Sequence, residues 1–399
     1  MAIQVPEDYV YLDYAATAPL CEEAAEAMAP YLAPGRANFA LGLNANSLHA
    51  PGRAAFEAME LARKQLAEDL GASRPNEIVF TSGATESDNM AVLGIARAAA
   101  ESRRKRDSSF VPRVVTSSIE HEAVLEPAKR LAHEGFEISY IAPNREGFIE
   151  PEDLASKLDE RTVLVSVQAA NSEIGTVQPT AQLAALAHEA GALYHVDATQ
   201  ALGKIPCDVG AWGVDAASFS AHKVGGPKGI GALYLKARTS CQPLLLGGGQ
   251  EEGRRSTTQN VAAIAGFTAA THAAVQRLAV EAERERGLRD LLYRELLALR
   301  GIRATVHVQP GCELHLPNIV HVLAHGFESE TLVLQLDRRG FGVSGGSACA
   351  SHSLEPSHVL RAVGISADES YGALRVSIGR YTTEEDLRRF IEALTDCLG

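Results

Sequence analysis

The chain has 399 residues, of which 46% are hydrophobic and 22% charged, a composition typical of a soluble globular protein large enough for two domains. Its formal net charge of −13 argues against non-specific nucleic-acid binding and against docking on anionic membranes. No signal-peptide pattern opens the sequence, and no apolar run approaches the length of a membrane span. We therefore expect a cytoplasmic protein whose six scattered cysteines are mostly free thiols.

The first part of the chain predicts few regular elements. A short strand is expected over 9–13, and helices are expected over 22–32 and 53–70. Between the helices, residues 38–51 are rich in asparagine, for which an ordinary polar loop is the simplest interpretation.

From residue 77 onward, strand and helix patterns alternate. Strands are expected over 78–80, 114–115, 138–140, 163–167, 193–196, 216–220 and 232–235. Helices are expected over 90–100, 124–133 and 181–190. This alternation predicts an α/β fold with a mostly parallel sheet covered on both faces.

After residue 260 the pattern changes to a long helix over 261–299 and then shorter α+β material. Strands are expected over 318–323 and 374–378, and helices over 329–338, 357–363 and from 384. We place the domain boundary in the long helix. The large domain then covers 17–262, and the smaller α+β domain combines 1–16 with 263–399.

Four candidate groups follow predicted strands, where ligands bind in open α/β sheets. Residues 81–86 precede a helix and either present backbone N–H groups to a phosphate or form an ordinary N-cap. Asp197 ends one strand, and it suits a pyridinium nitrogen as well as a structural ion pair. His121 follows another strand, where a catalytic role by stacking on a flat ring or shuttling protons and a plain position at a helix start are both open.

The fourth group is Lys223, which follows the strand over 216–220 and precedes four glycines and a proline. Schiff-base chemistry and a solvated turn that also holds Lys228 are both compatible with this stretch. Taken together, however, a phosphate cradle, a carboxylate, a flat stacking partner and a lysine describe a pyridoxal phosphate site.

With these residues in view, the chain resembles the class V aminotransferases of fold type I, and among them the cysteine desulfurases of the housekeeping and nitrogen-fixation type. The resemblance extends over nearly the whole length. The matching stretches are YLDYAATAP, NSLHAPGR, FTSGATESDN, SSIEHEAVLEP, NSEIGTVQP, HVDATQALGK, SFSAHKVGGPKGIGALY, LLLGGGQEEGRRSTTQN, VSGGSACASHSLEPSHVLRAVG and LRVSIGRYTTEED.

The resemblance implies a large domain built on a mostly parallel seven-stranded sheet and bound to pyridoxal 5'-phosphate. Lys223 would hold this cofactor as a Schiff base, Asp197 would pair with the ring nitrogen, and His121 would stack on the ring. The ring hydroxyl would contact Asn171 and Gln200. The phosphate would be held by Gly83, Ala84, Thr85, Ser220 and His222.

The same resemblance implies contributions from elsewhere in the chain. Thr258 would complete the phosphate cup from a neighbouring subunit, which implies a homodimer. Arg375 would clamp the substrate carboxylate, with Asn44 nearby. Cys349 would be the sulfur nucleophile, and its run of small neighbours suits a flexible loop better than a buried structural thiol.

The implied function is a cysteine desulfurase that converts L-cysteine to L-alanine and keeps the sulfur as a persulfide on Cys349, with Lys223 taking the Cα proton. The sulfur would pass to an iron–sulfur scaffold or another acceptor protein, and no metal site is expected. The chain departs from the family pattern at Ala45, Asp88 and Thr257. The family often has asparagine at the position of Asp88 and glycine at the position of Thr257.

Two alternatives remain open at this point. One is a selenocysteine lyase or another class V lyase or aminotransferase. The other is a sulfur-trafficking or cluster-assembly platform with Cys349 and His352 as ligands, a spacing that is weak by itself.

Overall fold

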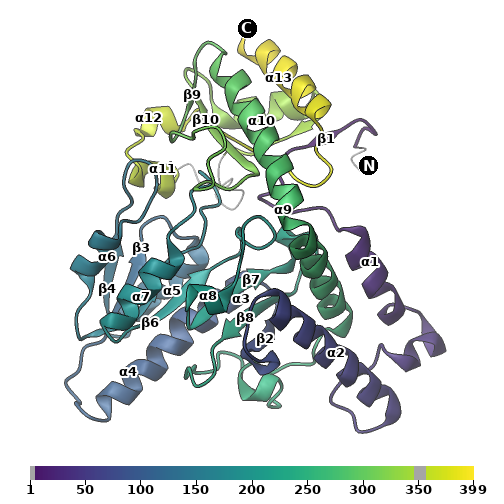
Figure 1. Ribbon diagram of the computed structural model, residues 1–399, viewed down its shortest axis with the longest axis vertical. Helices are drawn as coiled ribbons and strands as arrows, with labels where there is room; N and C mark the ends of the chain where they lie inside the picture. The colour runs from purple at the N-terminus through teal and green to yellow at the C-terminus, as the bar shows by residue number, and fades with distance from the viewer. Residues whose placement is uncertain (1–4, 346–355) are drawn as a thin grey trace.

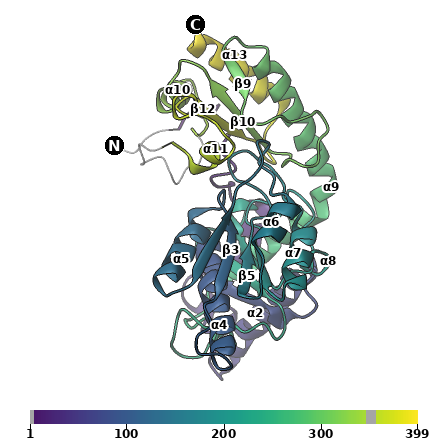
Figure 2. The ribbon, with the colours of Figure 1, turned by 90° about the vertical axis from the view of Figure 1, so that its left-hand side faces the viewer.

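The computed structural model describes residues 5–345 and 356–399, so Cys349 and His352 lie outside the described residues. The chain forms a large α/β unit and a smaller α+β unit, with the long helix α9 (Val261–Leu297) running between them (Figures 1 and 2). The expected fold class is thereby confirmed.

The large unit is built on a seven-stranded sheet with the order β2-β8-β7-β6-β5-β3-β4. Its strands are β2 (Ile78–Thr81), β3 (Arg113–Ser117), β4 (Glu137–Ile141), β5 (Thr162–Ser166), β6 (Leu193–Asp197), β7 (Ala216–Ser220) and β8 (Gly231–Leu235). The pairs from β4 through β7 are parallel, and β8 runs antiparallel to both β7 and β2. The sheet is therefore mostly parallel, as predicted.

Helices cover both faces of this sheet, and alternate strand residues point to opposite faces. On one face, Phe80 and Tyr194 pack in a core with α2 (Ala50–Asp69), α7 (Thr180–Glu189) and the start of α9. On the other face, Val79 and Leu164 pack against the second set of helices. That set comprises α3 (Ala84–Asn89), the π-helical segment Met90–Ile95, α4 (Ala96–Arg104) and α5 (Glu122–His133). Burial on both faces explains why these strands are almost continuously apolar.

The smaller unit contains an antiparallel sheet with the order β12-β10-β9. Its strands are β9 (Ile302–Ala304), β10 (Ile319–Ala324) and β12 (Ala373–Ser377), and its helices include α10 (Ser329–Asp337), α11 (His358–Ala362), α12 (Ala367–Ser370) and α13 (Glu384–Leu398). The N-terminal strand β1 (Val10–Tyr11) pairs with β11 (Phe341–Gly342), and Val10 shares a core with Leu374 and Phe390. This packing agrees with assigning residues 1–16 to the smaller unit, while the boundary at 262/263 stays a prediction.

Helix α9 belongs to both cores. Near its start, Ile264 and Phe267 pack against the large sheet, and near its end Leu292 and Leu296 pack in the smaller core. Two separate apolar faces on one 37-residue helix fix the position of the smaller unit relative to the sheet.

The sequence did not predict the short elements α6 (Pro151–Lys157), α8 (Val209–Trp212), β9, β11 and α12. Such elements span too few residues to show a hydrophobic period. The helix expected over 90–100 begins at Ala84, so the cradle residues lie at its N-terminus. Helix α1 covers Glu22–Met28 and continues as a 3-10 turn to Tyr31. Across the described ranges, none of the helices has the length and apolarity needed to cross a membrane.

Candidate active site

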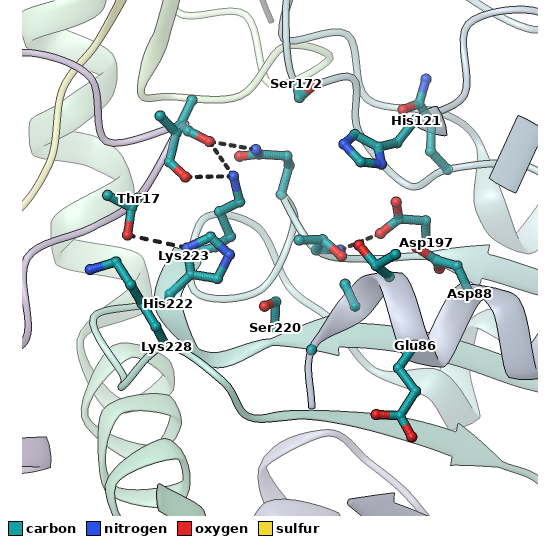
Figure 3. A pocket seen from close by; sticks show the side chains of 18 of the residues that line it. Thr17, Glu86, Asp88, His121, Ser172, Asp197, Ser220, His222, Lys223 and Lys228 are labelled. Atoms are coloured by element: carbon teal, nitrogen blue, oxygen red, sulfur yellow. Dashed lines mark hydrogen bonds between the residues drawn. The ribbon is translucent and has the colours of Figure 1, made fainter. Parts of the chain in front are cut away.

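A cavity of about 480 Å³ lies at the carboxyl ends of the parallel strands, between the sheet and the N-terminal segment of the smaller unit. It is lined by most of the residues that the sequence singled out: Gly83, Ala84, Thr85, His121, Asp197, Gln200, Ser220, His222, Lys223 and Arg375. These residues come from segments hundreds of positions apart. Figure 3 shows Lys223, His222 and Lys228 on one side of the cavity and Asp197, Asp88 and His121 on the other.

Lys223 ends the 3-10 turn Ala221–Lys223 that directly follows β7. Its Nζ donates hydrogen bonds to the carbonyl oxygens of Ala15, at 2.6 Å, and Ala16, at 2.8 Å. Both acceptors lie in the segment that joins the smaller unit to the sheet. Two backbone oxygens therefore hold the amine at the cavity wall. Both are carbonyl oxygens, so neither exchanges a proton with the amine.

Asp197 is the last residue of β6 and is 7% exposed. One carboxylate oxygen, Oδ1, accepts a hydrogen bond from the backbone N–H of Thr199 at 2.9 Å. Gln200 follows in the same turn, and its Nε2 donates to the Ala15 carbonyl oxygen at 3.0 Å. Gln200 thus lies beside Lys223, which donates to the same oxygen, and Asp197 lies across the cavity from both, an arrangement that suits a flat cationic ring with a carbonyl group at its other end.

His121 is both the N-cap of α5 and a lining residue of the cavity. Its Nδ1 accepts a hydrogen bond from the backbone N–H of Ala123 at 3.1 Å. In the neutral ring this arrangement leaves the proton on Nε2. The two interpretations of His121 that the sequence left open, helix start and cavity wall, therefore describe the same side chain.

The small residues at the start of α3 form an open cradle. Gly83 is the N-cap, with φ of 154°, and a Cβ built on Gly231 of β8 would lie 2.7 Å from the Gly83 Cα. The strand and the helix start therefore approach as closely as glycine permits. Backbone N–H groups at a helix N-terminus, together with the Ser220 hydroxyl in the cavity wall, fit a phosphate group.

His222 borders the same cradle and is held neutral. Its Nδ1 contacts the Thr17 Oγ1 at 3.1 Å. Burial, and to a smaller degree the charges of Lys223 and Lys228, lowers the pKa of His222 to about 4. His222 therefore offers a hydrogen bond, and Lys228 supplies positive charge near the cradle.

Arg375 brings a buried guanidinium from β12 into the cavity wall. It is 2% exposed, and its two terminal nitrogens donate to the Ser172 carbonyl oxygen at 2.9 Å and to Asp13 Oδ1 at 2.8 Å. The fork is thereby fixed in orientation, as recognition of a carboxylate requires.

The structure does not bring every predicted residue into this cavity. Asn171 is buried beside it, but its Oδ1 accepts from the N–H groups of Glu173 and Ile174 and its Nδ2 donates to the Ile119 carbonyl. Asn44 and Thr258 are exposed and lie outside the lining. The roles of these three residues stay predictions, as does that of Cys349, which lies outside the described residues.

Several lining residues carried no expectation of a role. Ser172 lies beside Asn171, and Asp88 lies one helical turn after the cradle, on the same helix. Asp88 follows Ala84 by four residues and Thr85 by three, so helical periodicity alone could have placed it on the same side of the helix as the cradle. Within residues 5–345 and 356–399, no group of three or more His, Cys, Asp or Glu side chains is arranged to hold a metal ion.

Comparisons with known proteins agree with this site. The family model described as Aminotransferase class-V matches residues 10–390. The cysteine desulfurase IscS of Dictyoglomus turgidum is 43% identical over 96% of this chain and 93% of its own length. The cysteine desulfurase IscS of Escherichia coli strain K12 is 41% identical over 98% of this chain and 93% of its own.

Solved structures give the same result. A NifS-like protein superposes with a TM-score of 0.87 at 37% identity, covering 98% of this chain and 99% of the other. A NifS-like protein from Rickettsia africae superposes with a TM-score of 0.81 at 27% identity, covering 97% and 99%. The match over nearly the full length, together with the lysine, carboxylate and cradle of the cavity, shows that the chain belongs to the class-V aminotransferase family.

Proposed function

We propose that this chain is a pyridoxal 5'-phosphate-dependent cysteine desulfurase, which converts L-cysteine to L-alanine and keeps the sulfur as a persulfide on Cys349. The observation that carries the proposal is the convergence of Lys223, Asp197, His121 and Arg375 on one cavity. A lysine opposite a carboxylate suits the cofactor, and a buried arginine at the rim suits an amino-acid carboxylate.

Different residues of the cavity would bind different parts of the cofactor. The cradle at Gly83, Ala84 and Thr85, with the Ser220 hydroxyl, would hold the phosphate. Lys223 would hold the aldehyde carbon covalently, and Asp197 would face the ring nitrogen. When bound, the cofactor supplies an electron sink that stabilises negative charge at the substrate Cα.

The protein's own groups then bind the substrate and move its protons. Arg375, fixed by Asp13 and the Ser172 carbonyl, would bind the carboxylate of L-cysteine through its planar fork. The Lys223 amine, once released, would take the proton from the substrate Cα. His121 would cover the ring face and exclude water from it.

Sulfur transfer is assigned to Cys349. The Cys349 thiolate would bond to the substrate sulfur as the Cβ–S bond breaks, and the Cβ would gain a proton to give alanine. Ser344 lies just before the segment that carries Cys349, and its backbone N–H and carbonyl pair with Arg375 at 3.2 and 2.7 Å. This pairing would keep the start of the segment beside the substrate carboxylate.

The proposal extends to partners. A persulfide on a protein thiol is chemically stable only until another thiol accepts it, so we assign a sulfur-acceptor protein, such as an iron–sulfur scaffold, as the downstream partner. The relatives named IscS support this assignment. We also propose a homodimer in the cytosol, with Thr258 reaching the partner's phosphate cradle.

The test is a turnover assay with L-cysteine, following alanine and sulfide together in the presence of a reductant. We expect Lys223→Ala to lose the visible absorbance of the bound cofactor and both products. Cys349→Ala should keep the absorbance and lose sulfide release, whereas Cys397→Ala, at a partly buried thiol of the last helix, should change neither. Normal sulfide release by Cys349→Ala would contradict the assignment, and preferential release of selenide from L-selenocysteine would favour a lyase.

A further inference from the structure

A row of hydrogen-bonded side chains crosses three adjacent strands beneath the cavity. Ser166 of β5 contacts His195 Nδ1 at 2.8 Å, and His195 Nε2 contacts the Ser218 hydroxyl of β7 at 2.9 Å. Beyond it, the Ser218 hydroxyl faces the carboxyl group of Asp88 on α3. All four side chains are buried, so the row is closed to solvent except where Asp88 meets the cavity.

The hydrogen bonds of the row can run in either of two directions. Burial lowers the pKa of His195 to about 3, so this ring is neutral and has one donor and one acceptor nitrogen. If Ser166 donates to Nδ1, then Nε2 donates to Ser218, and the Ser218 proton is directed at Asp88. In the reverse direction a protonated Asp88 directs its proton at Ser218, Ser218 donates to Nε2, and Nδ1 donates to Ser166. In both directions the row offers Asp88 one hydroxyl group and no positive charge.

Asp88 is poorly placed to carry a negative charge. It is 1% exposed, and its Oδ1 has no hydrogen-bond partner among the described residues; His195 Nε2 lies 3.6 Å from it. The other titratable groups that face it are carboxyls, Asp197 on β6 and Glu120 before α5. Burial, and then the charge of Asp197, raises the pKa of Asp88 well above its usual range.

Asp197 has a different environment. It borders the cavity more openly and accepts the backbone N–H of Thr199. Two negative charges on neighbouring buried carboxyls repel each other, and a proton on the more enclosed Asp88 removes that repulsion. Figure 3 shows Asp88 and Asp197 side by side on the same wall of the cavity.

We propose that Asp88 is a positioning residue that stays protonated beside Asp197, so that the Asp197 carboxyl faces a cationic ring nitrogen without a second negative charge next to it. The part that concerns the ring nitrogen rests on the proposed function. The protonation of Asp88 does not, because it follows from the packing of the chain without any bound group.

The first experiment uses the full-length apoprotein and infrared difference spectroscopy at neutral pH. Wild type minus Asp88→Asn should show the C=O stretch of a protonated carboxylic acid, because the amide replaces that acid with a group of the same shape. Wild type minus Glu120→Gln serves as the matched control for the other buried carboxyl. Appearance of a carboxylate band instead, in wild type minus Asp88→Asn, would overturn the proposal.

The second experiment measures binding of pyridoxal 5'-phosphate and the pH profile of its visible absorbance. Asp88→Asn should match wild type in both, because it is also neutral and offers an N–H donor. Asp88→Ala should weaken binding on the order of tenfold and shift the profile, because Asp197 loses its neighbour. Equal behaviour of the alanine and asparagine variants, or a shifted profile in Asp88→Asn, would overturn the positioning role.

The two experiments separate the two proposals. If the chain failed to bind the cofactor, the proposed function would fall while the infrared band still decided the state of Asp88. If the cofactor bound normally and the acid band were absent, only the inference about Asp88 would fall.

Discussion

At the scale of single residues, the site depends on groups whose environment departs from the ordinary. Two such residues, Thr257 and Glu120, take no part in the chemistry proposed for Lys223. Thr257 holds an unusual backbone conformation beside Thr258, and Glu120 is a fully buried carboxyl beside His121. Each gives a measurement that does not depend on turnover.

Thr257 has a φ of 156°, a conformation that glycine adopts far more readily than a residue with a branched side chain. We expect Thr257→Gly to stabilise the apoprotein by about 1 kcal/mol, because relief of strain exceeds the extra entropy that glycine gives the unfolded chain. Urea unfolding measures this. The control is Thr258→Gly, whose φ is not positive and which should destabilise; equal destabilisation by both variants would contradict the strain argument.

Glu120 makes stability depend on pH. Its carboxyl accepts hydrogen bonds from the Ser117 hydroxyl and the Gln168 N–H, yet burial raises its pKa from 4.5 to about 8. The folded protein keeps this proton where the unfolded chain has lost it, so the contribution is complete at low pH and disappears as the pH rises to about 8.

Glu120→Gln should therefore make the fall in stability between about pH 5 and pH 8 shallower, by up to about 1.4 kcal/mol per pH unit. Urea unfolding of the apoprotein across this range gives the slope. Glu122→Gln, at an exposed position two residues on, is the control and should leave the slope unchanged. An unaltered slope in Glu120→Gln would show that the carboxyl is ionised in the folded protein.

At the scale of elements, helix α11 lies shortly after Cys349 in the sequence and contacts segments that border the cavity. Ser357 caps α11 by accepting from the N–H groups of Val359 and Leu360, and its hydroxyl donates to Glu173 Oε2 at 2.7 Å. His358 Nε2 lies 2.9 Å from the Glu120 carbonyl oxygen, one residue before His121. The helix start is thus fixed to both segments that flank the cavity.

We expect Ser357→Ala to slow persulfide formation several-fold and to leave the absorbance of the bound cofactor unchanged, because the anchor lies eight residues after Cys349 and outside the cavity lining. Loss of the cap should also cost about 1 kcal/mol. Ser366→Ala removes the comparable cap of α12, where Ser366 bonds Glu369. If both variants slowed sulfur transfer equally, the effect would be one of stability alone.

The same scale shows what the sequence could predict. Alternation of apolar runs and amphipathic helices predicted the sheet and its parallel strands, and position after a strand brought Lys223, Asp197 and His121 to one edge. The antiparallel direction of β8 could not be predicted, because the apolar pattern of a strand is the same in both directions. The role of Asn171 at the ring stays a prediction, and the sequence did not show that its amide also closes the turn that leads to Glu173. Local hydrogen bonds of this kind are invisible before the backbone is known.

At the scale of the whole molecule, two exposed segments outside the cavity lining are held together. The Asn46 Nδ2 donates to Gln259 Oε1 at 2.9 Å, which joins the loop of Asn44 to the loop of Thr258. Leu48 is 90% exposed, and Phe56 lines a hollow of about 250 Å³ with Asn46 and Gln259. Exposed apolar side chains beside strained loops are typical of a surface that another chain covers.

If this face meets a second copy, each cavity contains Lys223 from one chain and Thr258 from the other. Lys223→Ala and Thr258→Ala homodimers should each have defective sites, in the second case through weaker phosphate binding. A heterodimer of the two should have one complete site and one that lacks both residues. Purified through two different tags, it should bind pyridoxal 5'-phosphate with wild-type affinity at about half of its sites.

A heterodimer of wild type with Lys223→Ala is the reference for one intact site per dimer. It has one complete site whether Lys223 and Thr258 of a site come from the same chain or from different chains. Sedimentation must show a dimer in every sample. If the mixed heterodimer bound the cofactor only as weakly as the Thr258→Ala homodimer, both residues would belong to the same chain's site. The exposed position of Thr258, outside the lining of its own cavity, makes the shared arrangement the expected result.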